Sequence, residues 1–191
     1  MRVVAGAARG IPLKVPKGDQ VRPTVDRLKE TLFNMIQAEI YERTVLDVFA
    51  GSGALGIEAL SRGARCAYFC EKNKATVEVI KDNLRRTKLE EKAQVLAGDF
   101  LGGLEKIQSA GVKLDLVFLD PPYQEEDLYR QAIEALTEKK LLAGDALIIA
   151  ETKSGFDFSF LEKYDTIKIE KYKKFKTNQY IFMRFGREVR K

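Results

Sequence analysis

The chain has 191 residues, of which 45% are hydrophobic and 32% are charged, and it carries a net charge of +5 without a single histidine. The lack of histidine excludes serine or cysteine triads and most zinc sites, and no stretch reaches the roughly 18 uninterrupted apolar residues of a membrane span. We therefore expect a cytosolic protein with one main domain, a small appendage and no metal site.

The charge is distributed unevenly along the chain. Residues 1–30 carry a net charge of +4, residues 31–162 carry −6, and residues 163–191 carry +7. Basic ends around an acidic middle are expected when the ends contact a polyanion and the middle performs chemistry. Solvated basic surface without a partner is an equally common interpretation.

The first 22 residues contain three glycines and two prolines between short apolar pieces, which predicts a small hairpin or arm. We assign residues 1–23 to this basic N-terminal arm and residues 24–191 to the main domain. Thr24 is expected to cap a helix, with Asp26 in its first turn. The apolar residues of that helix recur at helical spacing: Leu28, Leu32, Phe33, Ile36 and Ile40.

From residue 44 onward, strand-like and helix-like segments alternate. The predicted strands are residues 44–49, 65–70, 93–97, 114–119 and 146–151, and the predicted helices lie near 54–62, 74–87, 100–110 and 125–138. Such alternation predicts a parallel sheet with right-handed crossovers. Residues 166–172 and 180–185 are two more strands, joined too closely for a crossover, so we predict an antiparallel hairpin at the sheet edge. Strict alternation places Lys171 on the same face of this hairpin as Ile167 and Ile169.

A glycine-rich segment follows the first predicted strand of the sheet. Residues 45–56 read Val-Leu-Asp-Val-Phe-Ala-Gly-Ser-Gly-Ala-Leu-Gly, and Glu71 ends the next strand, 20 residues after Gly51. Such glycines let the backbone approach a ligand closely, and such an acid accepts hydrogen bonds from ribose hydroxyls. The spacing also fits a nicotinamide fingerprint, and a purely structural glycine turn is a third interpretation.

Acidic residues end four successive strands. They are Asp47, Glu71, Asp99 and Asp120. Because the carboxyl ends of parallel strands meet at one edge of a sheet, these side chains are expected to converge on one crevice. Their charge would repel the pyrophosphate of a dinucleotide but suits S-adenosylmethionine, which carries a sulfonium and an ammonium. We therefore expect a methyl-donor site, with Phe100 covering the adenine.

The fourth strand ends in Asp-Pro-Pro-Tyr, residues 120–123. An exocyclic base amine is a poor nucleophile because its lone pair is delocalised into the ring. The carboxylate of Asp120 and the carbonyl of Pro121 can each accept one N–H of that amine and favour a tetrahedral nitrogen, while Pro122 holds Pro121 extended. Tyr123 is expected to offer its face to an unstacked base. A rigid turn without chemistry is the alternative.

These segments resemble a known enzyme class. The alternation, the terminal hairpin and Asp-Pro-Pro-Tyr are similar to class I S-adenosylmethionine-dependent methyltransferases that modify exocyclic base amines. Residues 22–34, 47–59, 60–63 and 115–123 resemble the ribosomal small-subunit methyltransferase D family, which forms N2-methylguanine in 16S ribosomal RNA of the assembling small subunit. The resemblance implies an α/β Rossmann-like fold, with a mostly parallel seven-stranded sheet, a C-terminal antiparallel hairpin and helices on both faces.

The resemblance and the strand-end pattern together give the predicted site. The predicted catalytic residues are Asp120, Pro121, Pro122 and Tyr123. The predicted residues for S-adenosylmethionine are Asp47, Phe49, Gly51, Gly53, Glu71, Asp99 and Phe100. The predicted RNA contacts are Arg9, Arg22, Thr24, Arg27, Lys173, Lys174 and Lys176. For the residues near position 24, an ordinary helix N-terminus is the alternative interpretation.

Other functions remain open at this point. A DNA adenine-N6 methyltransferase would use the same motif, although no separate target-recognition region is visible in 191 residues. A non-catalytic RNA-binding assembly factor and a nicotinamide oxidoreductase are the others. We expect a monomer that binds 16S ribosomal RNA or a small-subunit assembly intermediate. The basic C-terminal hairpin, whose last strand Arg184, Arg187 and Arg190 are expected to follow, should position this RNA. The alternative role of the lysines in this hairpin is to keep an edge strand from aggregating.

Overall fold

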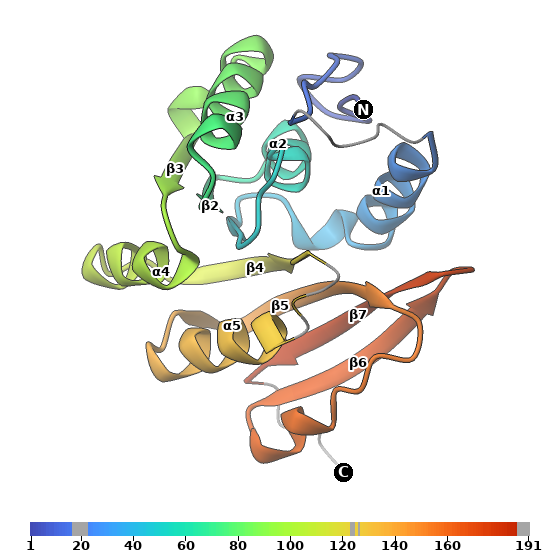
Figure 1. Ribbon diagram of the computed structural model, residues 1–191, viewed down its shortest axis with the longest axis vertical. Coiled ribbons are helices and arrows are strands. Elements are labelled where there is room, and N and C mark those ends of the chain that lie inside the picture. Colours follow the sequence, from blue (N-terminus) through green and yellow to red (C-terminus); the bar gives the residue numbers. More distant parts are fainter. Residues whose placement is uncertain (17–22, 123–124, 126, 187–191) are drawn as a thin grey trace.

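The computed structural model describes residues 1–16, 23–122, 125 and 127–186, without the side chains of residues 23–26 (Figure 1). The helices are α1 (Pro23–Met35), α2 (Ala54–Ser61), α3 (Lys74–Thr87), α4 (Phe100–Ser109) and α5 (Asp127–Glu138), with short 3-10 turns η1 (Gln37–Glu39), η2 (Glu90–Lys92) and η3 (Ser159–Lys163). The strands are β1 (Thr44–Asp47), β2 (Cys66–Glu71), β3 (Ala93–Ala97), β4 (Leu114–Leu119), β5 (Leu142–Lys153), β6 (Ile167–Lys174) and β7 (Asn178–Phe185). The predicted alternation is confirmed, and β5 is the strand whose length was most underestimated.

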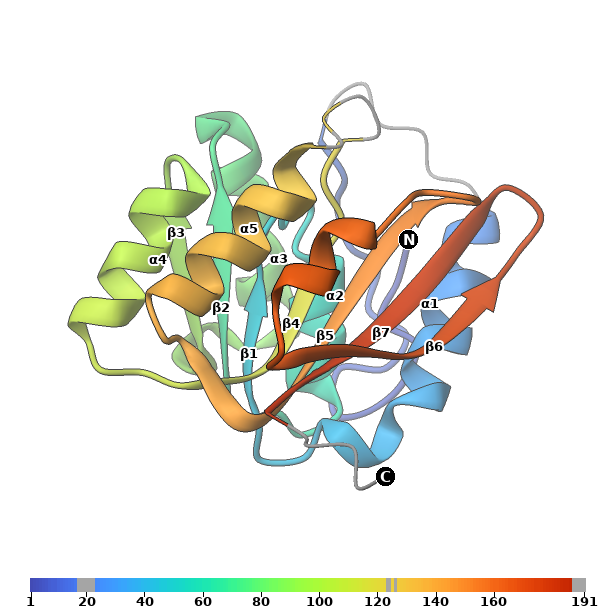
Figure 2. The same ribbon diagram turned by 90° about the horizontal axis from the view of Figure 1, so that it is seen from below.

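The seven strands form one sheet in the order β3-β2-β1-β4-β5-β7-β6. Strands β1 to β5 pair in parallel, and β7 runs antiparallel to both β5 and β6. Helices α1, α2 and α3 cover one face, and α4 and α5 cover the other (Figures 1 and 2). The α/β fold with a C-terminal antiparallel hairpin, expected from the sequence, is confirmed.

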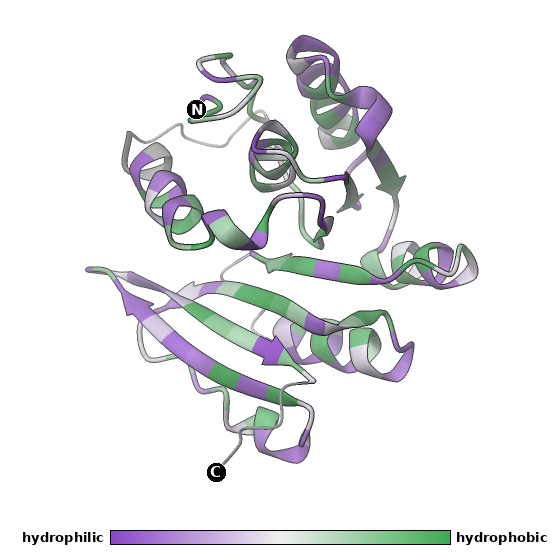
Figure 3. Cartoon of the chain, turned by 180° about the vertical axis from the view of Figure 1, so that it is seen from behind, coloured by the Kyte–Doolittle hydropathy of each residue, from purple (hydrophilic) through white to green (hydrophobic). Residues whose placement is uncertain are grey.

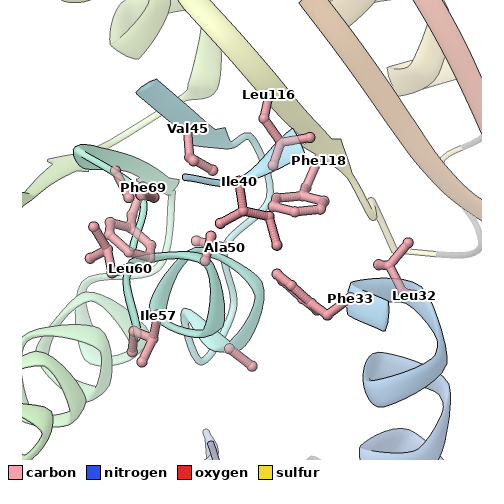
Figure 4. Packing of buried hydrophobic residues seen from close by; sticks show 14 of the residues in the cluster. Leu32, Phe33, Ile40, Val45, Ala50, Ile57, Leu60, Phe69, Leu116 and Phe118 are labelled. Carbon is pink, nitrogen blue, oxygen red and sulfur yellow. The ribbon is translucent and has the colours of Figure 1, made fainter. Parts of the chain in front are cut away.

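Alternate residues of the central strands supply two hydrophobic cores, one on each face. Val45 and Phe118 face α1 and α2, whereas Leu46 and Val117 face α4 and α5. In the first core the rings of Phe33 and Phe118 lie 5.7 Å apart (Figure 4). Figure 3 shows that the edge strand β6 is more hydrophilic than the central strands. Burial on both faces holds the central strands, and therefore their carboxyl ends, in fixed register.

The N-terminal hairpin is part of this packed structure. The amide of Val3 donates to the carbonyl of Ile11 at 3.0 Å, and that of Leu13 donates to Met1 at 3.0 Å. The fully buried carboxylate of Glu58 accepts the amide of Val4 at 2.8 Å. The same carboxylate pairs with the side chains of Lys29 at 3.3 Å and Arg62 at 2.8 Å. The hairpin, α1 and α2 are therefore joined by one buried ionic network.

The start of α1 and the face on which Lys171 lies differ from what the sequence analysis predicted. Helix α1 begins at Pro23, so Thr24 lies inside the first turn and does not occupy the capping position. Proline suits the first helical residue because its missing N–H would have no intrahelical partner there. In β6 the register shifts between Ile169 and Lys171, so Lys171 pairs with Phe182, and its Nζ lies 4.5 Å from the ring centroid. One inserted residue moves each following side chain of the strand to the opposite face of the sheet. Lys171 therefore does not share the face of Ile169.

Arg184 does not follow the last strand, contrary to what the sequence analysis expected. It lies within β7 with 5% of its surface exposed, and it donates to Glu39 at 2.9 Å and to Glu170 at 3.3 Å. A buried arginine that is paired with two carboxylates stabilises the fold and does not present its charge to a phosphate. Arg187 and Arg190 lie outside the described residues. None of the helices in the described part of the chain combines the length and apolar character needed to traverse a bilayer.

Candidate active site

A cavity of about 1010 Å³ opens at the carboxyl ends of the parallel strands. This is the edge at which ligands bind in open α/β sheets. Five of the acidic residues that line it lie at or beside the ends of β1 to β5: Asp47, Glu71, Asp99, Asp120 and Glu151. The four acids expected to converge therefore meet at one cavity, together with a fifth.

The glycine-rich turn after β1 is fixed between two of these carboxylates. The buried carboxylate of Asp47 accepts the amide of Gly56 at 3.2 Å. Glu71 accepts the amide of Gly51 at 3.1 Å and that of Asn73 at 2.8 Å. These bonds hold the turn and the ends of β1 and β2 in one arrangement.

The first two glycines of the turn have different roles. Gly51 has φ +52°, lines the cavity, and has no heavy atom within 4 Å of the position where a Cβ would stand. At Gly53, which has φ +78°, a Cβ would lie 3.2 Å from Ile80 and 3.3 Å from Ile57. The structure therefore places Gly51 at the cavity and turns Gly53 toward the core, so only the first of them is positioned to approach a ligand.

Two aromatic rings border the acidic cavity. Phe49 and Phe100 both line it, with ring centroids 5.3 Å apart at 61°. Asp99 caps α4 by accepting the amide of Leu101 at 2.8 Å, which fixes the position of Phe100. The thiol of Cys70 also lines the cavity, and burial, with the charges of Asp47 and Asp99, raises its pKa to about 12. The thiol is therefore protonated and unreactive at neutral pH.

The carboxyl groups of the cavity lie so close together and so deeply buried that full ionisation of all of them is unfavourable. Burial, reinforced by the charge of Glu71 and opposed by the hydrogen bond from Gly56, raises the pKa of Asp47 to about 7. Burial, with the charges of Glu151 and Asp47, holds the pKa of Asp120 well above the usual carboxyl range. A cationic ligand would compensate this charge.

The Asp-Pro-Pro segment reaches the same cavity from β4. Asp120, Pro121 and Pro122 all line it, and Pro122 accepts the amide of Glu125 at 2.9 Å. Asp120 and Pro121 therefore lie together at one wall of the cavity. Tyr123, the fourth residue of the predicted motif, lies outside the described residues.

Glu151 and Asn178 are among the cavity residues that the sequence analysis did not predict. Glu151 lines the cavity from β5, and its Oε1 accepts from the side chain of Asn178 at 2.8 Å. Glu151 is an acid at the end of a predicted strand, which is the signal that identified the other four acids. It could therefore have been predicted in the same way. Asn178 had no comparable signal, because it enters the site from the antiparallel strand β7.

The predicted RNA-binding residues lie apart from the acids. Lys173, Lys174 and Lys176 are exposed at the tip of the β6–β7 hairpin, where the neighbouring Thr177 and Asn178 line the cavity. The side chains of Arg9 and Arg27 are exposed on the N-terminal hairpin and on α1, respectively. Arg22 lies outside the described residues, as does the side chain of Thr24. The hairpin lysines therefore lie beside the cavity, as does Arg27, which precedes the cavity residues Leu28 and Lys29.

Comparison with known proteins identifies relatives over nearly the whole chain. The model of the family described as Conserved hypothetical protein 95 matches residues 1–184. Ribosomal RNA small subunit methyltransferase D of Haemophilus influenzae is 43% identical over 154 residues, covering 80% of this chain and 79% of the relative. The Escherichia coli protein of the same name is 38% identical over 153 residues, covering 80% of this chain and 75% of the relative.

Solved structures agree with this relationship. An Escherichia coli chain, yhhF, described as a methyltransferase, superposes with a TM-score of 0.82 at 32% identity, covering 98% of this chain and 99% of its own length. An O-methyltransferase from Bacillus cereus in complex with SAH gives a TM-score of 0.70 over 90% of this chain and 84% of its own. Its 16% identity shows a shared fold and no more.

Proposed function

Because the chain belongs to the Conserved hypothetical protein 95 family and has relatives named ribosomal RNA small subunit methyltransferase D, we propose that it methylates the N2 amine of a guanine in 16S ribosomal RNA. The methyl donor is S-adenosylmethionine. The observation that carries the proposal is the placement of Asp120 and Pro121 at the wall of an acidic, partly aromatic cavity. We further propose that the protein acts as a cytoplasmic monomer on a small-subunit assembly intermediate.

The residues of the cavity fit this donor. S-adenosylmethionine supplies an electrophilic methyl group when bound. Glu71 is placed to accept hydrogen bonds from ribose hydroxyls, and Phe49 and Phe100 offer apolar surface to an adenine. The excess of buried acid around Asp47 favours a ligand that carries positive charge. A dinucleotide would bring more negative charge into the same space.

Asp120 and Pro121 provide what a guanine amine requires. The carboxylate of Asp120 and the carbonyl of Pro121 are acceptors for its two N–H groups, which directs the nitrogen lone pair toward the methyl group. After transfer the nitrogen must lose one proton. The ionised carboxylate of Asp120 is the acceptor for that proton, and its raised pKa makes it a stronger base than an ordinary carboxylate.

Mass spectrometry of nucleosides tests the proposal. Small-subunit RNA or particles from cells lacking the protein are incubated with it and with isotopically labelled S-adenosylmethionine. Labelled N2-methylguanosine is expected. Label in N6-methyladenosine of added DNA, or no label in any nucleic acid, would reject the proposed substrate.

Donor affinity should increase with pH. Asp47 has a pKa of about 7, and its neutral form must lose a proton before it can attract a cation. Binding of S-adenosylmethionine is therefore expected to tighten about tenfold between roughly pH 6 and 8 and to release protons. Calorimetry at both pH values in two buffers measures both effects. S-adenosylhomocysteine, which lacks the sulfonium charge, and the Asp47→Asn variant should show a weaker dependence; equal dependence would contradict this electrostatic role.

The hairpin lysines should orient RNA without selecting the base. Replacing Lys173, Lys174 and Lys176 by alanine is expected to weaken RNA binding at low salt. It should also flatten the dependence of log affinity on log salt by about 0.7–0.9 per lost phosphate contact, while the modified base stays the same. A salt titration followed by fluorescence anisotropy measures the slope.

A matched control removes three lysines near the opposite edge of the sheet. Lys81, Lys88 and Lys92 are exposed in and after α3. Their triple alanine variant has the same net charge as the hairpin variant. If both variants show the wild-type slope, the hairpin lysines serve only to protect the edge strand.

A further inference from the structure

A second cavity, of about 520 Å³, lies beside the donor cavity, and β5 and α5 contribute residues to both. On β5, Glu151 lines the first cavity and Lys153 lines the second, about 7 Å further along the strand. On α5, Leu128 lines the first, whereas Asp127 and Arg130 line the second. A ligand in one cavity is therefore within reach of a ligand in the other.

The second cavity combines aromatic rings, cations and carboxylates. Phe156 and Phe160 line it and are partly exposed, and the guanidinium carbon of Arg130 lies 5.6 Å from the ring centroid of Phe160. Lys153 supplies a second cation, and Asp157 supplies an acceptor. Two hydrogen bonds from Ser159 lower the pKa of Asp157, so this carboxylate is ionised at neutral pH. Rings that stack on a base, cations for its phosphate and an acceptor for its N–H groups are the elements of a nucleotide site.

The aromatic wall is held by the same strand that carries Glu151. Tyr129 packs against Phe156 with ring centroids 4.9 Å apart, and Phe156 packs against Phe158 at 4.7 Å. The hydroxyl of Tyr129 donates to the backbone carbonyl of Glu151 at 2.5 Å. Figure 2 shows α5 beside the short orange-red helix η3, and Lys163 of η3 pairs with Glu134 of α5 at 3.0 Å. Contacts within the protein therefore hold the walls of the second cavity in place.

The second cavity also adjoins the hairpin that carries the basic tip. The amide of Ser154, which lines the second cavity, donates to the carbonyl of Thr177 at 3.1 Å. Thr177 lines the donor cavity, and Lys176 precedes it in the chain. A nucleic-acid strand whose phosphates follow the hairpin tip would pass the mouths of both cavities.

We propose that the second cavity binds a nucleotide adjacent to the target guanine, its base against Phe160 and its phosphate at Arg130 and Lys153. This inference rests on the proposed function and extends it to the flanking sequence. A base that enters the donor cavity leaves its neighbour without a stacking partner, and the aromatic wall of the adjoining cavity replaces that partner. The ligand class is a single-stranded nucleotide in RNA.

Two variants test the proposal against a closely matched control. Arg130 is 56% exposed and lies 3.8 Å from Asp127, three residues earlier on α5. Arg85 is 59% exposed and lies 3.5 Å from Asp82, three residues earlier on α3. Arg130→Glu and Arg85→Glu therefore make the same charge change at an exposed helical arginine that lies near an aspartate three residues earlier. Phe160→Leu removes the ring and keeps apolar contact with Phe158.

The readout is the affinity for single-stranded RNA that carries the fluorescent base 2-aminopurine on either side of a guanine. Arg130→Glu is expected to bind about tenfold more weakly, which is about 1.4 kcal/mol, whereas Arg85→Glu stays near wild type. Phe160→Leu is expected to lose the fluorescence quenching on one side only. Affinity for S-adenosylmethionine should not change in any variant.

The outcomes separate this inference from the proposed function. Wild-type affinity and quenching in both Arg130→Glu and Phe160→Leu would overturn the second nucleotide site even if methylation of guanine is observed. If wild-type protein methylates no RNA guanine, the proposed function fails, and the quenching experiment still decides whether the cavity stacks a base. Equal loss in Arg130→Glu and Arg85→Glu would show a general charge effect and would also reject the site.

Discussion

Replacing Asp120 by asparagine or alanine is expected to slow methyl transfer by roughly 10²–10⁴-fold, the usual contribution of a positioned proton acceptor. The carboxylate is needed most as the amine nitrogen becomes tetrahedral and then loses its proton, so the loss should fall on the chemical step. Single-turnover rates at saturating RNA and donor measure that step. A normal single-turnover rate in Asp120→Ala would show that the amine mechanism is wrong.

The asparagine variant should fold at least as well as the wild type. In the folded protein, burial and the charges of Glu151 and Asp47 hold the pKa of Asp120 above its value in the unfolded chain. An acid with a raised pKa destabilises the fold as the pH rises from its unfolded pKa toward the folded one, because the unfolded chain loses its proton first. At neutral pH a neutral amide removes that cost. Thermal unfolding of Asp120→Asn should therefore occur at the wild-type temperature or above, which separates a catalytic defect from misfolding.

The sequence predicted the elements of the central sheet well because their hydrophobic patterns are strong and local. Strand β4 and helix α3 occupy the predicted residues, and most other boundaries differ by one or two. The largest error in the sheet is at β5, where the polar residues 144 and 145 obscured a strand that begins at Leu142. Helix α1 begins two residues earlier than the predicted cap at Thr24 implies, because Pro23 was interpreted as belonging to the arm.

The missed features of the fold and of the site depend on the three-dimensional arrangement of the chain. Arg184 belongs to a basic stretch in the sequence, but its partner Glu39 lies 145 positions away, and only the fold shows that the pair is buried. The register shift near Glu170 has no pattern that distinguishes it from regular alternation. The orientations of Gly51 and Gly53 likewise follow from the φ angles of one turn, whereas the motif treats the two glycines alike. Strand-end acids were predictable because parallel topology alone brings them together.

The acids of the cavity impose a cost on the fold that the donor offsets. Burial raises the pKa of Asp47 to about 7. Ionisation of this side chain at high pH therefore lowers the free energy of unfolding, and this effect is largest without the donor. Natural sites often retain such destabilising groups because a ligand requires them. Addition of S-adenosylmethionine therefore stabilises the protein both by occupancy and by neutralising this charge.

Glu71→Ala is expected to weaken binding of S-adenosylmethionine at least tenfold. Hydrogen bonds to a charged acceptor contribute about 1.5–3 kcal/mol each, and the ribose offers two hydroxyls to this carboxylate. The change also removes the acceptor of the Gly51 and Asn73 amides. Calorimetry gives the affinity, and Glu78→Ala, which removes an exposed acid of α3 paired with Lys81, is the control for lost charge. Unchanged affinity in Glu71→Ala would remove the ribose assignment.

A donor analogue without ribose hydroxyls separates the two roles of Glu71. If this carboxylate binds the ribose, the analogue already lacks that contact, and the wild type and Glu71→Ala should bind it with similar affinity. If the carboxylate acts mainly by holding the amide of Gly51, the analogue should lose as much affinity in the variant as S-adenosylmethionine does. The direct role is expected to dominate, because the amide of Ala50 still donates to the carbonyl of Cys70 at 3.0 Å and keeps the turn joined to β2.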